Sequence, residues 1–111
     1  MKNYDSGEVI LLLFPFSDTK TAKRRPALVI FDCGDEDVLV ARISSQSAQS
    51  IYDVELSDWQ AGGLLFPSVV RVHKLATVEK RLIERKLGKL TDKDRGRIQE
   101  VFQDICSVIE G

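Results

Sequence analysis

Residues Lys23–Ile30 read Lys-Arg-Arg-Pro-Ala-Leu-Val-Ile, so three consecutive cations lead through a proline into an unbroken apolar run. The run continues to Phe31 and stops at turn-forming residues, which is typical of a strand buried on both faces. We expect Pro26 as the first strand residue, where its missing N–H costs no ladder hydrogen bond. Arg25 is then extended at the mouth of the strand, where its guanidinium could bind two phosphate oxygens. A solvated charge cluster beside a strand is the commoner use of such residues.

Composition predicts one globular domain over residues 1–111. The chain is 43% hydrophobic, which is ordinary for a folded protein of this length. Its net charge of −1 gives no general attraction to nucleic acid, so any such binding must come from a local patch. No apolar run approaches the ~20 residues that cross a bilayer, and the polar start does not resemble a signal peptide. We therefore expect a cytoplasmic protein without membrane association.

Cysteine and histidine usage argues against a metal site or another bound cofactor. Cys33 and Cys106 lie far apart, and the chain has a single histidine, His73. Such spacing matches no metal-binding motif, so reduced thiols are the expected state. His73 is expected on the surface of a strand.

Short apolar or alternating stretches, separated by turn residues, predict a mainly β protein with antiparallel strands. The expected strands are Glu8–Phe16, Ala27–Asp32, Val38–Ile43, Tyr52–Leu56, Ser68–Leu75 and Ile83–Leu90. Polar composition predicts loops at Ser17–Arg24 and Ser44–Ser50, and a turn at Glu79–Arg81.

A helix is predicted over Thr91–Ile109. Thr91 is a suitable N-cap, and Asp92 and Asp94 lie in the first turn, where the helix dipole favours carboxylates. Apolar residues at helical spacing define one buried face, consisting of Ile98, Val101, Phe102, Ile105, Val108 and Ile109. This face should pack on the sheet or on a second copy of the protein.

The sequence lacks a metal constellation, a glycine-rich phosphate loop and a Cys–His pair, so an enzyme of this kind needs a substrate that brings its own nucleophile. RNA does so, because its 2′-hydroxyl can attack the adjacent phosphate and leave a cyclic phosphate and a 5′-hydroxyl. Catalysis then requires cations near the phosphorus and groups that orient and transfer protons. Arg25 meets the first requirement. Ser44 and Ser45 would lie beside it if Ala27–Asp32 and Val38–Ile43 form a hairpin.

Several short motifs occur in order along the chain. They are Gly7-Glu8-Val9, Arg25-Pro26-Ala27-Leu28-Val29-Ile30, Ile43-Ser44-Ser45-Gln46-Ser47, Phe66-Pro67-Ser68-Val69-Val70, Leu75-Ala76-Thr77-Val78 and Leu87-Gly88-Lys89-Leu90. Their order and spacing, more than any single piece, resemble the MazF/PemK toxin family. The resemblance runs from Gly7 to about Ile109.

This resemblance implies an SH3-like small barrel with a C-terminal helix (MazF/CcdB-like), usually homodimeric, acting as the toxin of a type II toxin–antitoxin system. Typical members cleave single-stranded RNA, such as mRNA, at short sequences without a metal, and a cognate antitoxin covers the RNA groove. Arg25 would stabilise charge on the phosphorus and donate a proton to the leaving oxygen. Ser44, where the family commonly has threonine, would orient the phosphate or the 2′-hydroxyl. Asp18 and Ser45 are candidate helpers, and RNA contacts are expected from Lys20, Lys23, Arg24, Gln46, Arg71 and Lys74.

Two other functions remain open from the sequence. Relatives on the same fold poison DNA gyrase through an aromatic-containing C-terminal tip, whereas this chain ends Val108-Ile109-Glu110-Gly111. A non-catalytic RNA-binding member is the other alternative, because serine in place of threonine has a freer χ1 and the chain is acidic.

Overall fold

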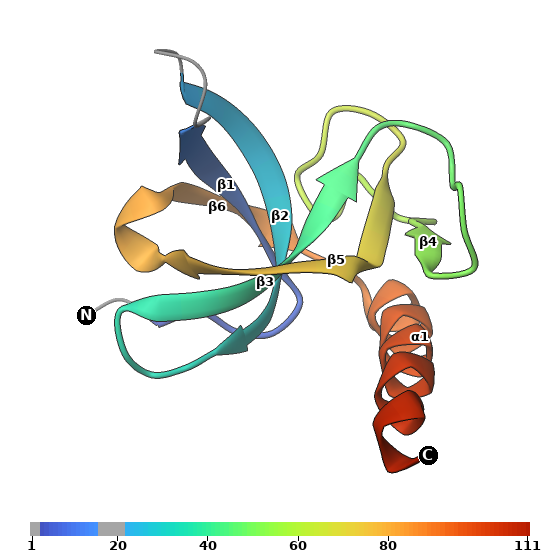
Figure 1. Cartoon of the computed structure of the whole chain (residues 1–111). Helices are drawn as coiled ribbons and strands as arrows, with labels where there is room; N and C mark the ends of the chain where they lie inside the picture. Colours follow the sequence, from blue (N-terminus) through green and yellow to red (C-terminus); the bar gives the residue numbers. More distant parts are fainter. Residues whose placement is uncertain (1–2, 16–21) are drawn as a thin grey trace.

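The computed structural model describes residues 3–15 and 22–111, which form a curled antiparallel sheet followed by one helix (Figure 1). Every neighbouring pair of strands is antiparallel, in the order β4-β5-β3-β2-β1-β6. The elements are β1 (Glu8–Pro15), β2 (Ala22–Asp32), β3 (Asp37–Ser44), β4 (Asp53–Glu55), β5 (Val69–Glu79), the 3-10 turn η1 (Lys80–Leu82), β6 (Ile83–Lys89) and α1 (Asp92–Glu110). The prediction of a mainly β small barrel with a C-terminal helix is confirmed.

The apolar run of β2 is buried on both faces of the sheet from Ala27 to Val29, as its sequence predicts, but its last residue, Phe31, is exposed. Leu28 belongs to a cluster on the helix side, together with Val9. Ala27 and Val29 belong to a second cluster on the opposite side. Since successive side chains of a strand point to opposite faces, an unbroken apolar run is required wherever both faces are covered.

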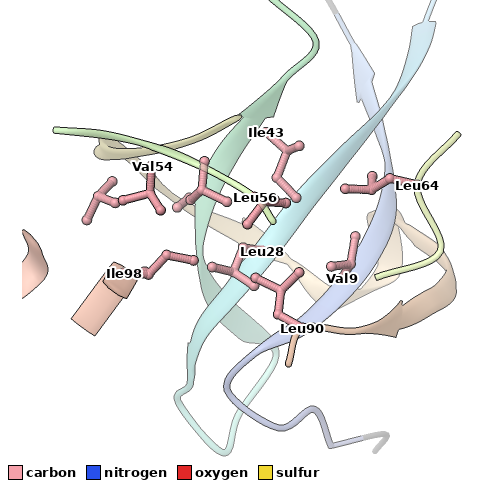
Figure 2. Close-up of a cluster of buried hydrophobic side chains, with 11 residues drawn as sticks. Val9, Leu28, Ile43, Val54, Leu56, Leu64, Leu90 and Ile98 are labelled. Carbon is pink, nitrogen blue, oxygen red and sulfur yellow. The ribbon is translucent and has the colours of Figure 1, made fainter. Parts of the chain in front are cut away.

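Figure 2 shows the core on the helix side, where labelled side chains from separate strands and loops point toward one another. Leu56 and Leu64 come from the segment between β4 and β5, and Ile98 comes from α1. The partly buried Trp59 packs against the same cluster. Each fully buried aliphatic side chain stabilises the fold by about 1.5–3 kcal/mol.

Helix α1 begins as predicted but is buried over only part of its length. The Thr91 Oγ1 accepts a hydrogen bond from the Asp94 N–H at 3.4 Å. Ile98 is buried, and Val101, Phe102 and Ile105 pack against the core. Val108 and Ile109 are 76% and 87% exposed in the single chain, so the last turn of the predicted face does not pack on the sheet, and its packing on a second copy stays a prediction. The reason is geometric, because the end of α1 extends beyond the sheet (Figure 1).

Strand β2 begins earlier than its sequence suggests. Lys23, Arg24 and Arg25 all pair with β1, and Arg25 lies opposite Leu12. The predicted loop is therefore wrong from Ala22 onward, because pairing with the apolar β1 outweighs the polar composition. Pro26 is an interior residue of β2 and is tolerated because the ladder to β3 starts only at Ala27.

Strand β5 is longer than predicted and carries a large bulge. Ala41 of β3 pairs with Leu75, but the next residue, Arg42, pairs with Arg71. Three residues of β5, Val72-His73-Lys74, therefore have no partner on β3. Bulges of this kind bend a strand and redirect its side chains, and Figure 1 shows β5 turning sharply. Within residues 3–15 and 22–111 no helix has both the length and the apolar character to span a membrane.

Candidate functional site

A groove of about 880 Å³ opens where β2, the end of β3, the segment before β5 and the bulge of β5 meet. The apolar side chains of Ala27, Val40 and Ile43 are buried at its floor. Its described polar and charged side chains are Arg25, Arg42, Ser44, Ser45, Gln46, Ser68, Lys74 and Arg85. Four of these are cations, and no described lining residue is acidic. A groove of this composition attracts anions, although the chain as a whole carries a net charge of −1.

The β2–β3 hairpin brings Arg25 and Ser44 to the same groove. The hairpin register places Ala27 opposite Arg42. Two residues further toward the same end of the hairpin are Arg25 on β2 and Ser44 on β3, and both line the groove. The structure thus brings together the two residues expected to be catalytic, while their roles stay predictions.

The Ser44 side chain is oriented by a local hydrogen bond. Its Oγ accepts a hydrogen bond from the Gln46 N–H at 3.1 Å. Serine has a freer χ1 than threonine, and this contact favours the orientation of the Ser44 Oγ seen here. The hydroxyl proton of Ser44 remains available for donation into the groove. Ser45 and Gln46, which follow directly, also line the groove.

Arg24 and Arg25 occupy opposite faces of β2, because neighbouring strand residues alternate. The Arg25 side chain is exposed in the groove, and no carboxylate in the described part of the chain pairs with it. The Arg24 Nε instead donates to Glu84 Oε2 at 2.7 Å. Arg24 is absent from the groove lining, so the structure does not bring it to the proposed site.

The other expected RNA contacts divide into three groups. Lys74 lines the groove from the bulge of β5. Lys23 is exposed on β2 and lies outside the described groove lining. Arg71 also lies outside this lining, and its Nη2 donates a hydrogen bond to Gln49 Oε1 at 2.9 Å. The predictions for Asp18 and Lys20 fall outside the described residues.

Sequence reasoning missed Arg42, Arg85 and Phe66 as groove residues. Arg42 could have been found, because it lies two residues before Ser44 and therefore on the same face of the strand. Arg85 belongs to β6, which reaches the groove only through its pairing with β1. Phe66 lies in the irregular segment before β5, where the sequence carries no periodic signal.

Asp94 has a structural role that its position in the first helical turn did not reveal. Its side chain is fully buried. Its Oδ1 accepts the Ser57 N–H at 3.0 Å, and its Oδ2 accepts the Asp58 N–H at 2.9 Å. The carboxylate thereby links α1 by hydrogen bonds to the segment between β4 and β5, which continues into the groove lining.

The acidic turn after β2 is kept apart from the groove. The Lys80 ammonium lies 2.8 Å from Asp32 Oδ1 and, with the N–H groups of Gly34 and Tyr4, lowers the pKa of Asp32 to about 2. None of the carboxylates between Asp32 and Asp37 lines the groove. Among the described residues, no cluster of three or more histidine, cysteine or acidic side chains could hold a metal.

Residues 5–106 match the sequence model of a family described as the PemK-like, MazF-like toxin of type II toxin-antitoxin systems. A comparison with curated protein sequences gave no match. Among solved structures, MazE-MazF (Form-II) from Deinococcus radiodurans is similar, with 17% identity, a TM-score of 0.77, and coverage of 94% of this chain and 96% of that chain.

Two further solved structures share the fold. An endoribonuclease from Mycobacterial species has 16% identity and a TM-score of 0.74, covering 96% of this chain and 94% of that chain. The Mycobacterium tuberculosis toxin MazF-mt6 has 20% identity and a TM-score of 0.67, covering 86% of this chain and 93% of that chain. With the family match extending over residues 5–106, the chain belongs to the PemK/MazF toxin family of type II toxin–antitoxin systems.

Proposed function

We propose that this toxin is an endoribonuclease that cleaves single-stranded RNA at short sequences without a metal. The observation that supports this most directly is the cationic groove that holds Arg25 and Ser44 together. A polyanion enters such a groove favourably even though the whole chain is slightly acidic. The endoribonuclease with a similar fold adds support from a related architecture.

In the proposed reaction the 2′-oxygen forms a bond to phosphorus and the bond to the 5′-oxygen breaks. The proton of the 2′-hydroxyl passes to water or to the candidate helper Asp18 as the bond forms. The departing 5′-oxygen takes a proton from Arg25, which regains one from water. Arg25 stabilises the charge that develops on the phosphate oxygens, since its planar guanidinium can donate two parallel hydrogen bonds. Ser44, whose Oγ accepts the Gln46 N–H, donates a hydrogen bond that orients the phosphate or the 2′-hydroxyl.

The groove offers further contacts along the RNA. Lys74 is suited to a backbone phosphate, and Ser45 and Gln46 can hydrogen-bond a phosphate or a base. Lys23 and Arg71 would contact RNA only where it extends beyond the groove. Asp18 stays a candidate helper in proton transfer, and Lys20 stays a candidate backbone contact.

We also propose a homodimer that acts in the cytoplasm and is neutralised by a cognate antitoxin. Membership of a toxin–antitoxin family supports the antitoxin. A structure with a similar fold is described as an endoribonuclease in complex with its cognate antitoxin. Neutralisation by an antitoxin would require the groove to be covered, and its cations favour an acidic segment for that purpose.

The test is incubation of the purified protein with a long unstructured RNA in EDTA. The expected products are discrete fragments with 5′-hydroxyl ends. Arg25→Ala should lower the cleavage rate about 100- to 1,000-fold, the usual cost of removing one donor to a developing anion. Ser44→Ala should lower it strongly, and Ser44→Thr should retain activity.

Arg24→Ala is the matched control, because this cation lies next to Arg25 on the opposite face of β2 and pairs with Glu84. Its cleavage rate should stay within about threefold of the unmodified protein. Full activity in both Arg25→Ala and Ser44→Ala would refute the site assignment. Intact RNA from folded, unmodified protein would refute the proposed activity, and a gyrase-dependent DNA break assay would then be decisive for the alternative.

A further inference from the structure

We infer that Phe66 forms a stacking site for one unpaired RNA base beside Arg25 and Ser44. This inference rests on the proposed ribonuclease function and adds a residue that selects or positions the substrate. Phe66 lines the groove and is 65% exposed. It is the single aromatic among the described lining residues. Its neighbour Leu65 is 83% exposed and also lines the groove, so the two form an exposed apolar patch of the kind that marks a contact site.

The backbone that carries Phe66 is held in place. Ser68 is buried, and its Oγ donates a hydrogen bond to the Phe66 carbonyl at 2.8 Å. Pro67 lies between them and restricts the backbone further. Strand β5 starts immediately afterwards at Val69. The ring is therefore presented from a restrained segment, so binding loses little backbone entropy.

The charge of the groove favours RNA as the occupant. Arg25, Arg42, Lys74 and Arg85 line the groove together with its apolar side chains, and no described lining residue is acidic. An unpaired base has a flat apolar face and a polar edge. Phe66 suits the face, and the exposed Gln46 amide in the same groove offers both a donor and an acceptor for the edge. Stacking on aromatic side chains is the usual way in which proteins bind unpaired bases.

The experiment starts from the sequence that the unmodified protein cleaves. A non-cleavable oligonucleotide of this sequence, with a 2′-deoxy sugar at the cleavage position, carries the fluorescent base 2-aminopurine at each position in turn. Stacking on Phe66 should quench the fluorescence at one position. Phe66→Ala and Phe66→Leu should abolish that quenching and weaken binding about 10-fold or more, whereas Phe66→Tyr and Phe66→Trp should retain both.

Phe31→Ala is the matched control. Phe31 is 59% exposed, similar to Phe66, but it lies on β2 outside the described groove lining. Its replacement should leave binding, quenching and cleavage unchanged. An equal loss in Phe31→Ala would show a general effect of removing surface aromatics and would overturn the inference.

The inference and the proposed function fail in different ways. If the unmodified protein does not cleave RNA, the proposed function is wrong. If it cleaves RNA but Phe66→Ala binds within twofold, the function stands and the stacking site is wrong. Normal behaviour of Phe66→Leu, or a changed sedimentation of Phe66→Ala, would assign Phe66 to a protein contact and also overturn the stacking site.

Discussion

Replacing Asp94 with alanine should remove a large part of the folding stability. Asp94 is fully buried and accepts the N–H groups of Ser57 and Asp58 at 3.0 and 2.9 Å. Hydrogen bonds to a charged group contribute about 1.5–3 kcal/mol each, and both part-buried N–H groups would lose their acceptor. The expected loss is therefore about 3–6 kcal/mol, against a typical total of about 5–15 kcal/mol for a domain. Asp94→Asn retains one acceptor oxygen and should lose roughly half as much.

The assay is urea unfolding followed by far-UV circular dichroism, at one protein concentration because dimerisation would shift the apparent stability. Asp92→Ala is the matched control from the same helical turn. The Asp92 side chain is 95% exposed and pairs with Arg95 on the surface, so its loss should cost less than about 1 kcal/mol. A loss below about 1 kcal/mol for Asp94→Ala, or an equal loss for Asp92→Ala, would refute the structural role assigned to Asp94.

Three further predictions concern acid stability and two glycines. The pKa of Asp32 falls from its ordinary 3.8 to about 2 in the folded protein, so its ionised form stabilises the fold above about pH 4 and this contribution disappears as the pH falls toward 2. Urea unfolding between pH 5 and 2 should show that the free energy of unfolding falls less with decreasing pH in Asp32→Asn than in the unmodified protein. The same pH dependence in both proteins would contradict the contact between Asp32 and Lys80. Gly96→Ala should raise the free energy of unfolding by up to about 1 kcal/mol, since an added Cβ meets nothing within 4 Å and glycine is unfavourable in a helix. Gly63→Ala should lower it by more than about 2 kcal/mol, because φ is +76° and the Cβ would overlap the Leu87 carbonyl; calorimetric melting in which both alanine variants shift the same way would contradict this difference.

Much of the fold was predictable because it depends on local patterns. The short apolar run that starts at Ala27 favours a strand covered on both faces, and Thr91 with the apolar spacing after it marks the start and the buried face of α1. Strand ends were less predictable. Residues 22–26 include three consecutive cations and a proline, and they extend β2 because β1 offers a partner. Val108 and Ile109 continue the helical pattern, but the pattern carries no information on where the sheet ends.

The candidate site was predictable only in part. Arg25 and Ser44 follow from one hairpin, because antiparallel pairing brings the start of one strand beside the end of the next. Arg85 and Phe66 belong to segments that are far in the sequence from Arg25 and Ser44. Lys74 lines the groove because of the bulge in β5, which no local sequence pattern predicts.

The sequence by itself determined the mainly β class, the family resemblance and the hairpin that carries Arg25 and Ser44. These properties depend on residues close along the chain, on periodicity and on short motifs in order. Only the tertiary structure decided that four cations line one groove in which no described residue is acidic. It also decided that the Asp94 carboxylate binds the backbone of the segment between β4 and β5 and that the Phe66 side chain is exposed in the groove. Such properties arise from contacts between residues far apart in the chain, and the packing of the whole sheet sets them.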